Sequence, residues 1–425
     1  MCELALDMVR TSLSTLMSAR LLATNAAWAL VSHVLHRGSF MLGAILLARS
    51  LPSGDFAAYS YFQMTVFMLS TYAAMGLGVT ASRFFAEYGH QRDGASAPLG
   101  TLLALSCGIS AVAFFLILLL PSAWLDAGVS VPQWLIALGV AATVAGVVPD
   151  GGILGLEKYR QASLVSLLSA LCMLGMIGVA AMHQSPLLGM WGIVASLAVQ
   201  NLGQLIVIVR TVGWQAIAGS FRWSAQILRK LASFAGPMFL VSILAGSGTW
   251  IVGRMILAST GALEFSAYSI GLQWFALGSL LPGMVSRVVL PRLVRNRGQD
   301  SRHLVHMAVL LALVPACAMA AGAFVLSPWL IKIYGNLYQD FLLIIPVFLV
   351  ISIFNAPINT IGNGIVAHDG QFQWLIITVA ALLIMIISLA LFSIKNSWSA
   401  VTSHALSTVA MLLMVLRVGR KRRLI

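Results

Sequence analysis

The chain has 425 residues and a formal net charge of +13; 60% of its residues are hydrophobic and only 9% are charged. Roughly a quarter of the residues in soluble domains are charged. Charged residues at this low frequency cannot cover a water-facing surface, which excludes a soluble fold. An all-α integral membrane protein is therefore expected.

Apolar stretches of about 18–25 residues, each long enough to cross ~30 Å as a helix, recur along the whole chain. The twelve expected transmembrane helices are 22–48, 57–81, 97–120, 132–149, 162–182, 187–209, 235–258, 265–286, 304–327, 341–360, 372–393 and 398–416.

The positive charges gather in alternate loops. Of the 25 Lys and Arg residues, 20 fall at the two ends of the chain or in one set of loops; Arg49, Lys332 and Lys395 fall in the opposite set, and Arg37 and Arg254 lie within spans. Because Lys and Arg are enriched on the cytoplasmic side, both termini are expected in the cytoplasm. Topology then accounts for most of the net charge, and no nucleic-acid partner is expected.

An internal repeat divides the chain. The sequence DFAAYS at 55–60 returns 209 positions later, in a similar form, as EFSAYS at 264–269. When the alignment is given a one-residue gap before this match, so that the offset is 210, Leu47-Ala48 match Leu257-Ala258. Two six-helix bundles of the same orientation form a parallel repeat, an architecture typical of transporters that work by alternating access. The expected segments are a cytoplasmic N-terminal segment (1–21), an N-terminal bundle (22–209), a cytoplasmic linker (210–234), a C-terminal bundle (235–416) and a basic cytoplasmic tail (417–425).

A charge within the bilayer is costly and marks a functional candidate. His33, His36 and Arg37 are spaced i, i+3, i+4 and share one helical face. A helix starting at Leu21 rises about 24 Å by Arg37, which places it in the outer half of the bilayer. Arg37 either lines a central cavity that attracts a phosphate or an acidic sugar, or extends outward to the interface or to helix-end carbonyls. The two histidines are equally well explained by packing.

Further polar residues lie in other spans. Arg254 is near the outer end of the seventh span, where extension to the interface is the favoured explanation. Asn355, Asn359 and Asn363 form a stripe at i, i+4 and i+8, which suits either sugar hydroxyls in a hydrated lumen or hydrogen bonds between helices. The candidate substrate-binding residues are Arg37, His33, His36, Arg254, Asn355 and Asn359.

Enzymatic signals are missing from the sequence. The four cysteines have no metal-binding spacing, and there is no Walker A, HExxH or GxSxG motif. No catalytic residue, metal or cofactor is therefore expected, and the protein is not expected to be an enzyme. None of the twelve acidic residues lies deep within an expected span, although cation-coupled exporters usually need a buried carboxylate.

The stretch LLARSLPSGDFAAYS at 46–60 resembles the first loop of Wzx-like bacterial polysaccharide and O-antigen flippases, a branch of the multidrug/oligosaccharidyl-lipid/polysaccharide (MOP) superfamily. Residues 257–269 and the FAGP run at 234–237 are similar to the matching second-half patterns. The resemblance implies a MATE-like fold of two pseudo-symmetric six-helix bundles. Unlike typical members, which often carry several buried Lys or Arg residues, this chain has only Arg37 clearly within the membrane.

The resemblance also implies an activity in the bacterial inner membrane. Such proteins move undecaprenyl-pyrophosphate-linked oligosaccharide units to the outer leaflet by alternating access, for lipopolysaccharide O-antigen, capsule or exopolysaccharide. Implied partners are the lipid-linked substrate, membrane lipid, a polysaccharide polymerase and chain-length proteins.

Two alternatives remain. A MATE-like multidrug or cation antiporter is disfavoured because the expected spans lack a central acid. A membrane-embedded glycan polymerase or ligase is disfavoured by the repeat and by the short outer connections.

Overall fold

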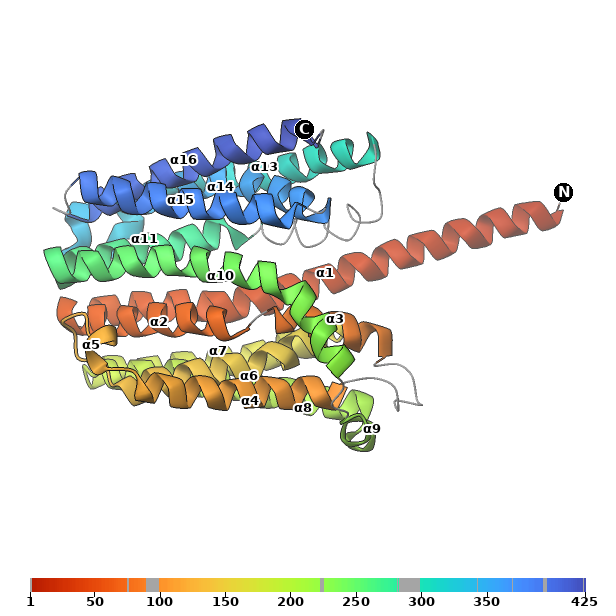
Figure 1. Ribbon diagram of the computed structural model, residues 1–425, viewed down its shortest axis with the longest axis horizontal. Helices are drawn as coiled ribbons and strands as arrows, with labels where there is room; N and C mark the ends of the chain where they lie inside the picture. Colours follow the sequence, from red (N-terminus) through yellow and green to blue (C-terminus); the bar gives the residue numbers. More distant parts are fainter. Residues whose placement is uncertain are drawn as a thin grey trace.

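A computed structural model describes residues 2–74, 76–88, 99–221, 225–280, 282, 299–341, 343–368, 370–392, 396–422 and 424–425. Within these ranges the chain forms helices joined by short turns (Figure 1). The first half contains α1 (Cys2–Ser50), α2 (Ser53–Ala74), α3 (Leu77–Tyr88), α4 (Leu99–Leu119), α5 (Ser122–Leu125), α6 (Gln133–Gly155), α7 (Tyr159–Met182), α8 (Pro186–Val212) and α9 (Trp214–Gly219). The second half contains α10 (Ala225–Thr260), α11 (Ala262–Gly278), α13 (Gln299–Tyr334), the 3-10 helix η1 (Asn336–Phe341), α14 (Ile344–Ala367), α15 (Gln371–Leu391) and α16 (Ser397–Lys421).

Several expected boundaries differ from the structure by a few residues, for example α6 and α14, which end at Gly155 and Ala367 instead of 149 and 360, and two differences change the arrangement of the helices. The expected span 57–81 is divided, because α2 ends at Ala74 and α3 starts at Leu77. Gly76 lies between them with φ +71°, a left-handed conformation that an α-helix cannot contain. In addition, α10 begins at Ala225, ten residues before the expected 235, so helix replaces part of the expected linker.

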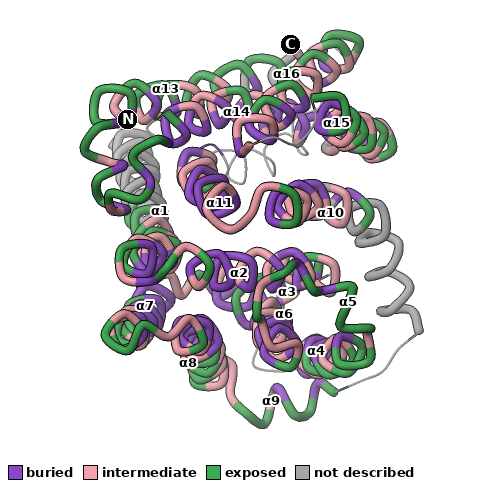
Figure 2. The backbone as a smooth tube through the Cα atoms, turned by 90° about the vertical axis from the view of Figure 1, so that its left-hand side faces the viewer, coloured by how far each residue is buried: buried purple, intermediate pink, exposed green. Residues whose placement is uncertain are grey.

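Nine helical segments in the described part of the chain are long and apolar enough to cross a membrane. They belong to α1 (over Ala27–Ser50), α4, α6, α7, α8, α13, α14, α15 and α16. The protein is therefore a multi-pass membrane protein. The other three long helices, α2, α10 and α11, contact one another in the middle of the molecule (Figure 2). There α2 buries eleven of its residues against protein rather than lipid, so it needs a less apolar sequence.

Equivalent helices pack alike in the two halves. In the first half α6 packs against α2, α4 and α8, and in the second half α14 packs against α11, α13 and α16. The repeated sequence forms the starts of α2 and α11, where Phe56, Tyr59, Phe265 and Tyr268 are all fully buried. The recurring aromatic residues thus fill the same place in each half.

Close helix contact in the first half depends on small residues. Gly151 and Gly155 of α6 face the backbone of α3, and a Cβ on either glycine would collide with the carbonyl oxygen of Gly78 or Ser82. The GxxxG spacing puts both glycines on one face, which is the pattern that lets membrane helices approach closely. This contact positions α3 against the core of the first half.

Candidate functional site

The halves meet where α2 lies against α10 and α11. The indole Nε1 of Trp250 on α10 donates a hydrogen bond to Thr65 Oγ1 on α2 at 3.0 Å. The ring of Tyr61, also on α2, lies 6.5 Å from the Trp250 ring and 6.3 Å from the Phe265 ring. Aromatic packing and hydrogen bonds together join the halves near the starts of α2 and α11.

Arg254 adds a second link between the halves. Its guanidinium donates to the carbonyl oxygens of Trp124 at 2.5 Å and Ala123 at 3.1 Å, both on α5 of the first half. Its Cζ atom also lies 5.5 Å from the Trp250 ring centroid, a cation–π distance. The sequence favours extension of this side chain to the membrane–water interface. In the structure the side chain links the two halves, at the end of the bundle where α1 finishes and α2 begins.

Arg37 lies in a cationic and aromatic cluster formed by α1 and α2. The His36 ring packs edge-on against Phe40 at 5.2 Å, and Phe40 packs edge-on against Phe67 of α2 at 5.4 Å. The Arg37 Cζ atom lies 5.8 Å from the centroid of the same Phe67 ring. Arg37 is exposed, whereas His33 and His36 are half-buried. Its guanidinium is thus held over an aromatic face while it stays accessible.

Helical geometry gives the depth and direction of Arg37. Within the span Ala27–Ser50 it lies ten residues from one end and 13 from the other, so about 15 and 20 Å from them. Gly43 faces Ile177 and Met173 of α7. Arg37 is six residues away and points about 120° from that direction, toward α2.

The asparagines lie elsewhere. Asn355 Nδ2 on α14 donates to Ser279 Oγ at the end of α11, 3.0 Å away, which is a hydrogen bond between helices of the second half. Asn359 is half-buried one turn further along α14. The structure therefore brings His33, His36 and Arg37 together, and places Arg254, Asn355 and Asn359 at two other locations.

The polar residues of the sixth expected span also join helices. Gln200 Nε2 donates to Ser166 Oγ at 3.3 Å, Asn201 Nδ2 to the Ala142 carbonyl at 2.6 Å, and Gln204 Nε2 to Asp150 Oδ1 at 3.0 Å. Each contact links α8 to α6 or α7, so these three side chains join helices of the first half.

Some polar residues of the core were not selected from the sequence. His404 on α16 lies between Phe275 and Phe348, with ring centroids 5.1 and 5.8 Å away. The criterion applied to His33, a histidine within a span, would have found it. Tyr72 on α2 hydrogen-bonds Ser247 on α10, but neither residue is charged, so nothing in the sequence marked this pair.

Of the acidic residues that the structure describes near the spans, Asp150 lies within α6, five residues before its last residue, where it accepts the hydrogen bond from Gln204. Asp55 and Glu264 occupy the first turns of α2 and α11, and Glu264 Oε2 accepts a hydrogen bond from the Ser397 backbone N–H at 2.7 Å. Among the residues described, no group of three or more His, Cys, Asp or Glu side chains could hold a metal ion.

Comparison with solved structures identifies the fold. A MATE family multidrug resistance transporter of the MOP superfamily, in its inward-facing conformation, aligns over 93% of this chain and 98% of its own, with a TM-score of 0.76 and 16% identity. The lipid II flippase MurJ aligns over 92% of this chain and 87% of its own, with a TM-score of 0.66 and 14% identity. The expected MATE-like fold is therefore confirmed.

Comparison with known sequences identifies the family. The EPS I polysaccharide export inner membrane protein EpsE of Ralstonia nicotianae (strain ATCC BAA-1114 / GMI1000) is 26% identical over 287 residues, which cover 66% of this chain and 64% of that protein. EpsE of Ralstonia solanacearum is 26% identical over 288 residues, again covering 64% of its length. The match thus spans slightly less than two thirds of these relatives. The family model described as "Polysaccharide biosynthesis protein" matches residues 22–297, and the chain belongs to this family.

Proposed function

We propose that the protein is a flippase that moves undecaprenyl-pyrophosphate-linked oligosaccharide units across the bacterial inner membrane by alternating access. The product would supply O-antigen, capsule or exopolysaccharide synthesis. The family match, the EpsE relatives named for polysaccharide export and the MurJ-like fold support this proposal. A polysaccharide polymerase and chain-length proteins would act on the product.

The observation that carries the proposal is the position of Arg37. A cation at mid-span is costly unless it meets water or an anion, and this one is exposed beside Phe67 on the helix that joins the halves. The pyrophosphate group of the substrate carries the complementary charge. Arg37 would attract it, while the neighbouring aromatic surface would contact the apolar faces of the sugars.

The proposed topology gives each end of the bundle a role. Twelve spans would form by adding α2, α10 and α11 to the nine apolar helices. With both termini cytoplasmic and bundles at 22–209 and 235–416, the end held by Arg254 faces outward. Substrate would then enter from the cytoplasmic side, and release would require the hydrogen bonds from Arg254 to Ala123 and Trp124 to break.

A MATE-like multidrug or cation antiporter is the second candidate, because a MATE transporter gives a TM-score of 0.76. A cationic drug would be repelled by Arg37, so this function requires a carboxylate partner at mid-span. The described carboxylates of α2 and α11 are in first turns instead.

Deletion of the gene distinguishes the two functions. A flippase deletion should abolish surface polysaccharide and cause lipid-linked units to accumulate facing the cytoplasm, which enzymatic labelling of spheroplasts and lysed cells measures. Complementation with the full chain should restore both readouts. Loss of drug resistance with unchanged polysaccharide would instead identify an antiporter, and accumulation of units facing outward would identify a polymerase.

A further inference from the structure

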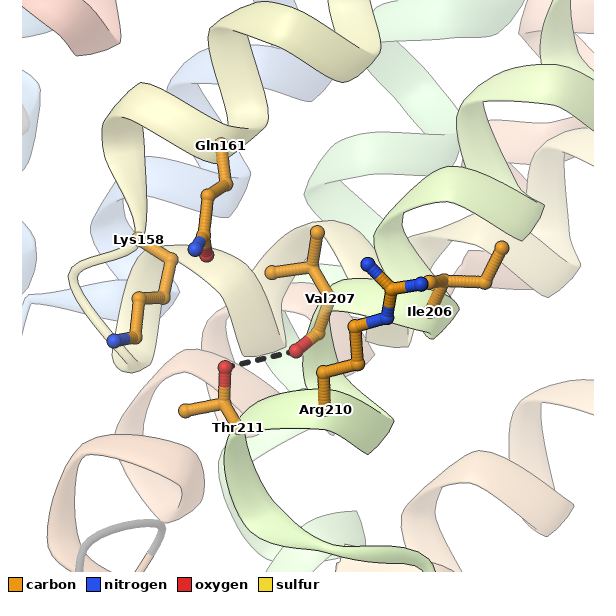
Figure 3. Close-up of a pocket in the computed structure, with 6 residues that line it drawn as sticks. All are labelled: Lys158, Gln161, Ile206, Val207, Arg210 and Thr211. Carbon is orange, nitrogen blue, oxygen red and sulfur yellow. Dashed lines mark hydrogen bonds between the residues drawn. The ribbon is translucent and has the colours of Figure 1, made fainter.

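A cavity of about 450 Å³ that is lined by two basic side chains lies between the start of α7 and the end of α8. Figure 3 shows Lys158 and Gln161 on one side of it and Arg210 and Thr211 on the other. The lining residues are Lys158, Gln161, Ile206, Val207, Arg210 and Thr211. The site uses only the first half of the chain, and none of its residues belongs to the Arg37 cluster.

The charge of this cavity is positive. Lys158 immediately precedes α7 and Arg210 lies in the last turn of α8, and no carboxylate is found among the described lining residues. The N-terminus of α7 receives no side-chain cap from Lys158, so its first backbone N–H groups also favour an anion. Two cations and an amide therefore line this cavity, and a helix N-terminus lies beside it.

A cavity of the same volume at the opposite end of the first half has the opposite character. It is lined by residues of the α2 start, the α5–α6 loop and the α8 start, and Asp55 is the one charged residue in its described lining. The comparison shows that positive charge distinguishes the α7–α8 cavity and is not a general property of the grooves between these helices.

Apolar side chains continue from the cavity along both helices. Leu164, Leu168 and Leu171 on α7 follow Gln161, and Ile206 and Leu202 on α8 precede Arg210, at helical spacings of three or four residues. These five side chains are between 51% and 61% exposed. A positively charged cavity above two exposed apolar stripes matches an amphiphile with an anionic head and acyl chains.

The position along the membrane normal suits such a ligand. Lys158 immediately precedes the candidate span Tyr159–Met182, and Arg210 lies in the last turn of the span Pro186–Val212. The head end of the site is therefore at the boundary between water and hydrocarbon, whichever way the protein is oriented. Basic pockets between membrane helices at this depth bind anionic lipid headgroups.

The site is remote from the contact between halves. The helices α7 and α8 pack on each other and on other first-half helices, and Figure 2 places them on the side of the first half away from α10 and α11. A ligand here would face the surrounding lipid. We propose that the α7–α8 cavity binds the phosphodiester headgroup of an anionic phospholipid, whose acyl chains lie along the leucines of α7 and α8.

Lipid binding to the purified full chain tests this site. Delipidated protein in detergent is titrated with phosphatidylglycerol, and retained lipid is measured by native mass spectrometry beside the thermal shift. The double variant Lys158→Gln with Arg210→Gln should bind about 30-fold more weakly, and each single variant about fivefold, as expected for each basic residue at an anionic surface. The control Arg160→Gln with Arg420→Gln removes the same charge outside the cavity and should bind like the wild type. If the double variant does not fold, the single variants carry the test.

Other ligands separate the sources of the anion. Three other ligands should each bind at least tenfold more weakly than phosphatidylglycerol. Phosphatidylethanolamine lacks the net negative charge, inorganic phosphate lacks acyl chains, and dihexanoyl phosphatidylglycerol lacks most of the acyl-chain length. Equal binding by phosphate alone would overturn the lipid assignment. So would displacement of phosphatidylglycerol by undecaprenyl pyrophosphate at much lower concentration, which would identify a substrate site, or equal loss of affinity in the control variant.

Discussion

Helices α1 and α10 occupy equivalent places in the repeat, yet they carry different chemistry. With the offset of 210 that aligns Leu47 with Leu257, Gly43 falls on Gly253, and both are points of close helix approach. A Cβ at Gly43 would meet Ile177 and Met173 within the first half, whereas one at Gly253 would meet Met64 of the other half. Both helices thus have a glycine at this position, but in α10 the glycine allows close contact between the halves.

The polar positions of the two helices diverge further. The same offset places Arg37 opposite Ser247, and Ala44 opposite Arg254. Ser247 makes an uncharged hydrogen bond with Tyr72 on α2, while Arg37 lies over Phe67 on the same helix. The comparison teaches that the repeat preserves packing and distributes two cations differently. Arg37 lies within the span of α1, where we propose that it binds substrate, and Arg254 lies near the end of α10, where it joins the halves.

The largest effect is expected at Arg37. Arg37→Ala should reduce transport by at least tenfold at normal protein level, because a hydrogen bond to a charged group contributes about 1.5–3 kcal/mol. Complementation of the deletion strain, scored by surface polysaccharide, is the measurement. Arg37→Lys should keep part of the activity. Full activity of Arg37→Ala would remove the substrate role, and rescue by a second change, Ser247→Arg, would show that the two equivalent positions are interchangeable.

A smaller effect is expected at Arg254. Arg254→Gln removes the charged donor to the Trp124 and Ala123 carbonyls, and partial exposure limits the change to about 1 kcal/mol, or roughly fivefold in the equilibrium between closed and open ends. A cysteine introduced at Ser53, in a background without native cysteines, should react several-fold faster with an impermeant maleimide. Arg254→Lys should have a weaker effect, and unchanged labelling in Arg254→Gln would contradict the linking role.

The Tyr72–Ser247 pair should have a lesser effect. Tyr72→Phe and Ser247→Ala each remove one neutral hydrogen bond between the halves, with a contribution of about 1 kcal/mol. The same labelling assay should show a two- to fivefold change for either variant. The double variant should resemble each single variant, because both remove one shared interaction; additive changes would indicate that the two hydroxyls act separately.

The smallest change is expected at Asn355. Asn355→Ala removes the hydrogen bond to Ser279 and should lower the free energy of unfolding by about 1 kcal/mol, seen as a small decrease in melting temperature in detergent. Asn359→Ala, one turn away, is the matched control and should melt like the wild type. If Asn359→Ala instead lowers the melting temperature and Asn355→Ala does not, Asn359 is the packing residue and Asn355 is free to contact sugars.

Prediction from sequence was most successful where one physical requirement dominates. Composition identified a membrane protein, and the EFSAYS repeat identified two equivalent helix starts, because hydrophobic length and buried aromatic residues leave direct traces in sequence. Prediction was less successful for breaks within helices and for contacts between residues on different helices. The division at Gly76 requires knowledge of a backbone angle, and the apolar residues around it gave no sign of an end.

The candidate site divides in the same way. The sequence by itself determined that Arg37 is a costly charge within a span and shares a helical face with His33 and His36, because helical spacing is a local property. Only the tertiary structure decided that Arg37 lies over Phe67, that Arg254 contacts the carbonyls of α5, and that Asn355 bonds Ser279. These contacts join residues 30 to 130 positions apart in the chain. Packing of one helix against another, within a half for Arg37 and Asn355 and between the halves for Arg254, brings them together, and spacing along one helix does not encode it.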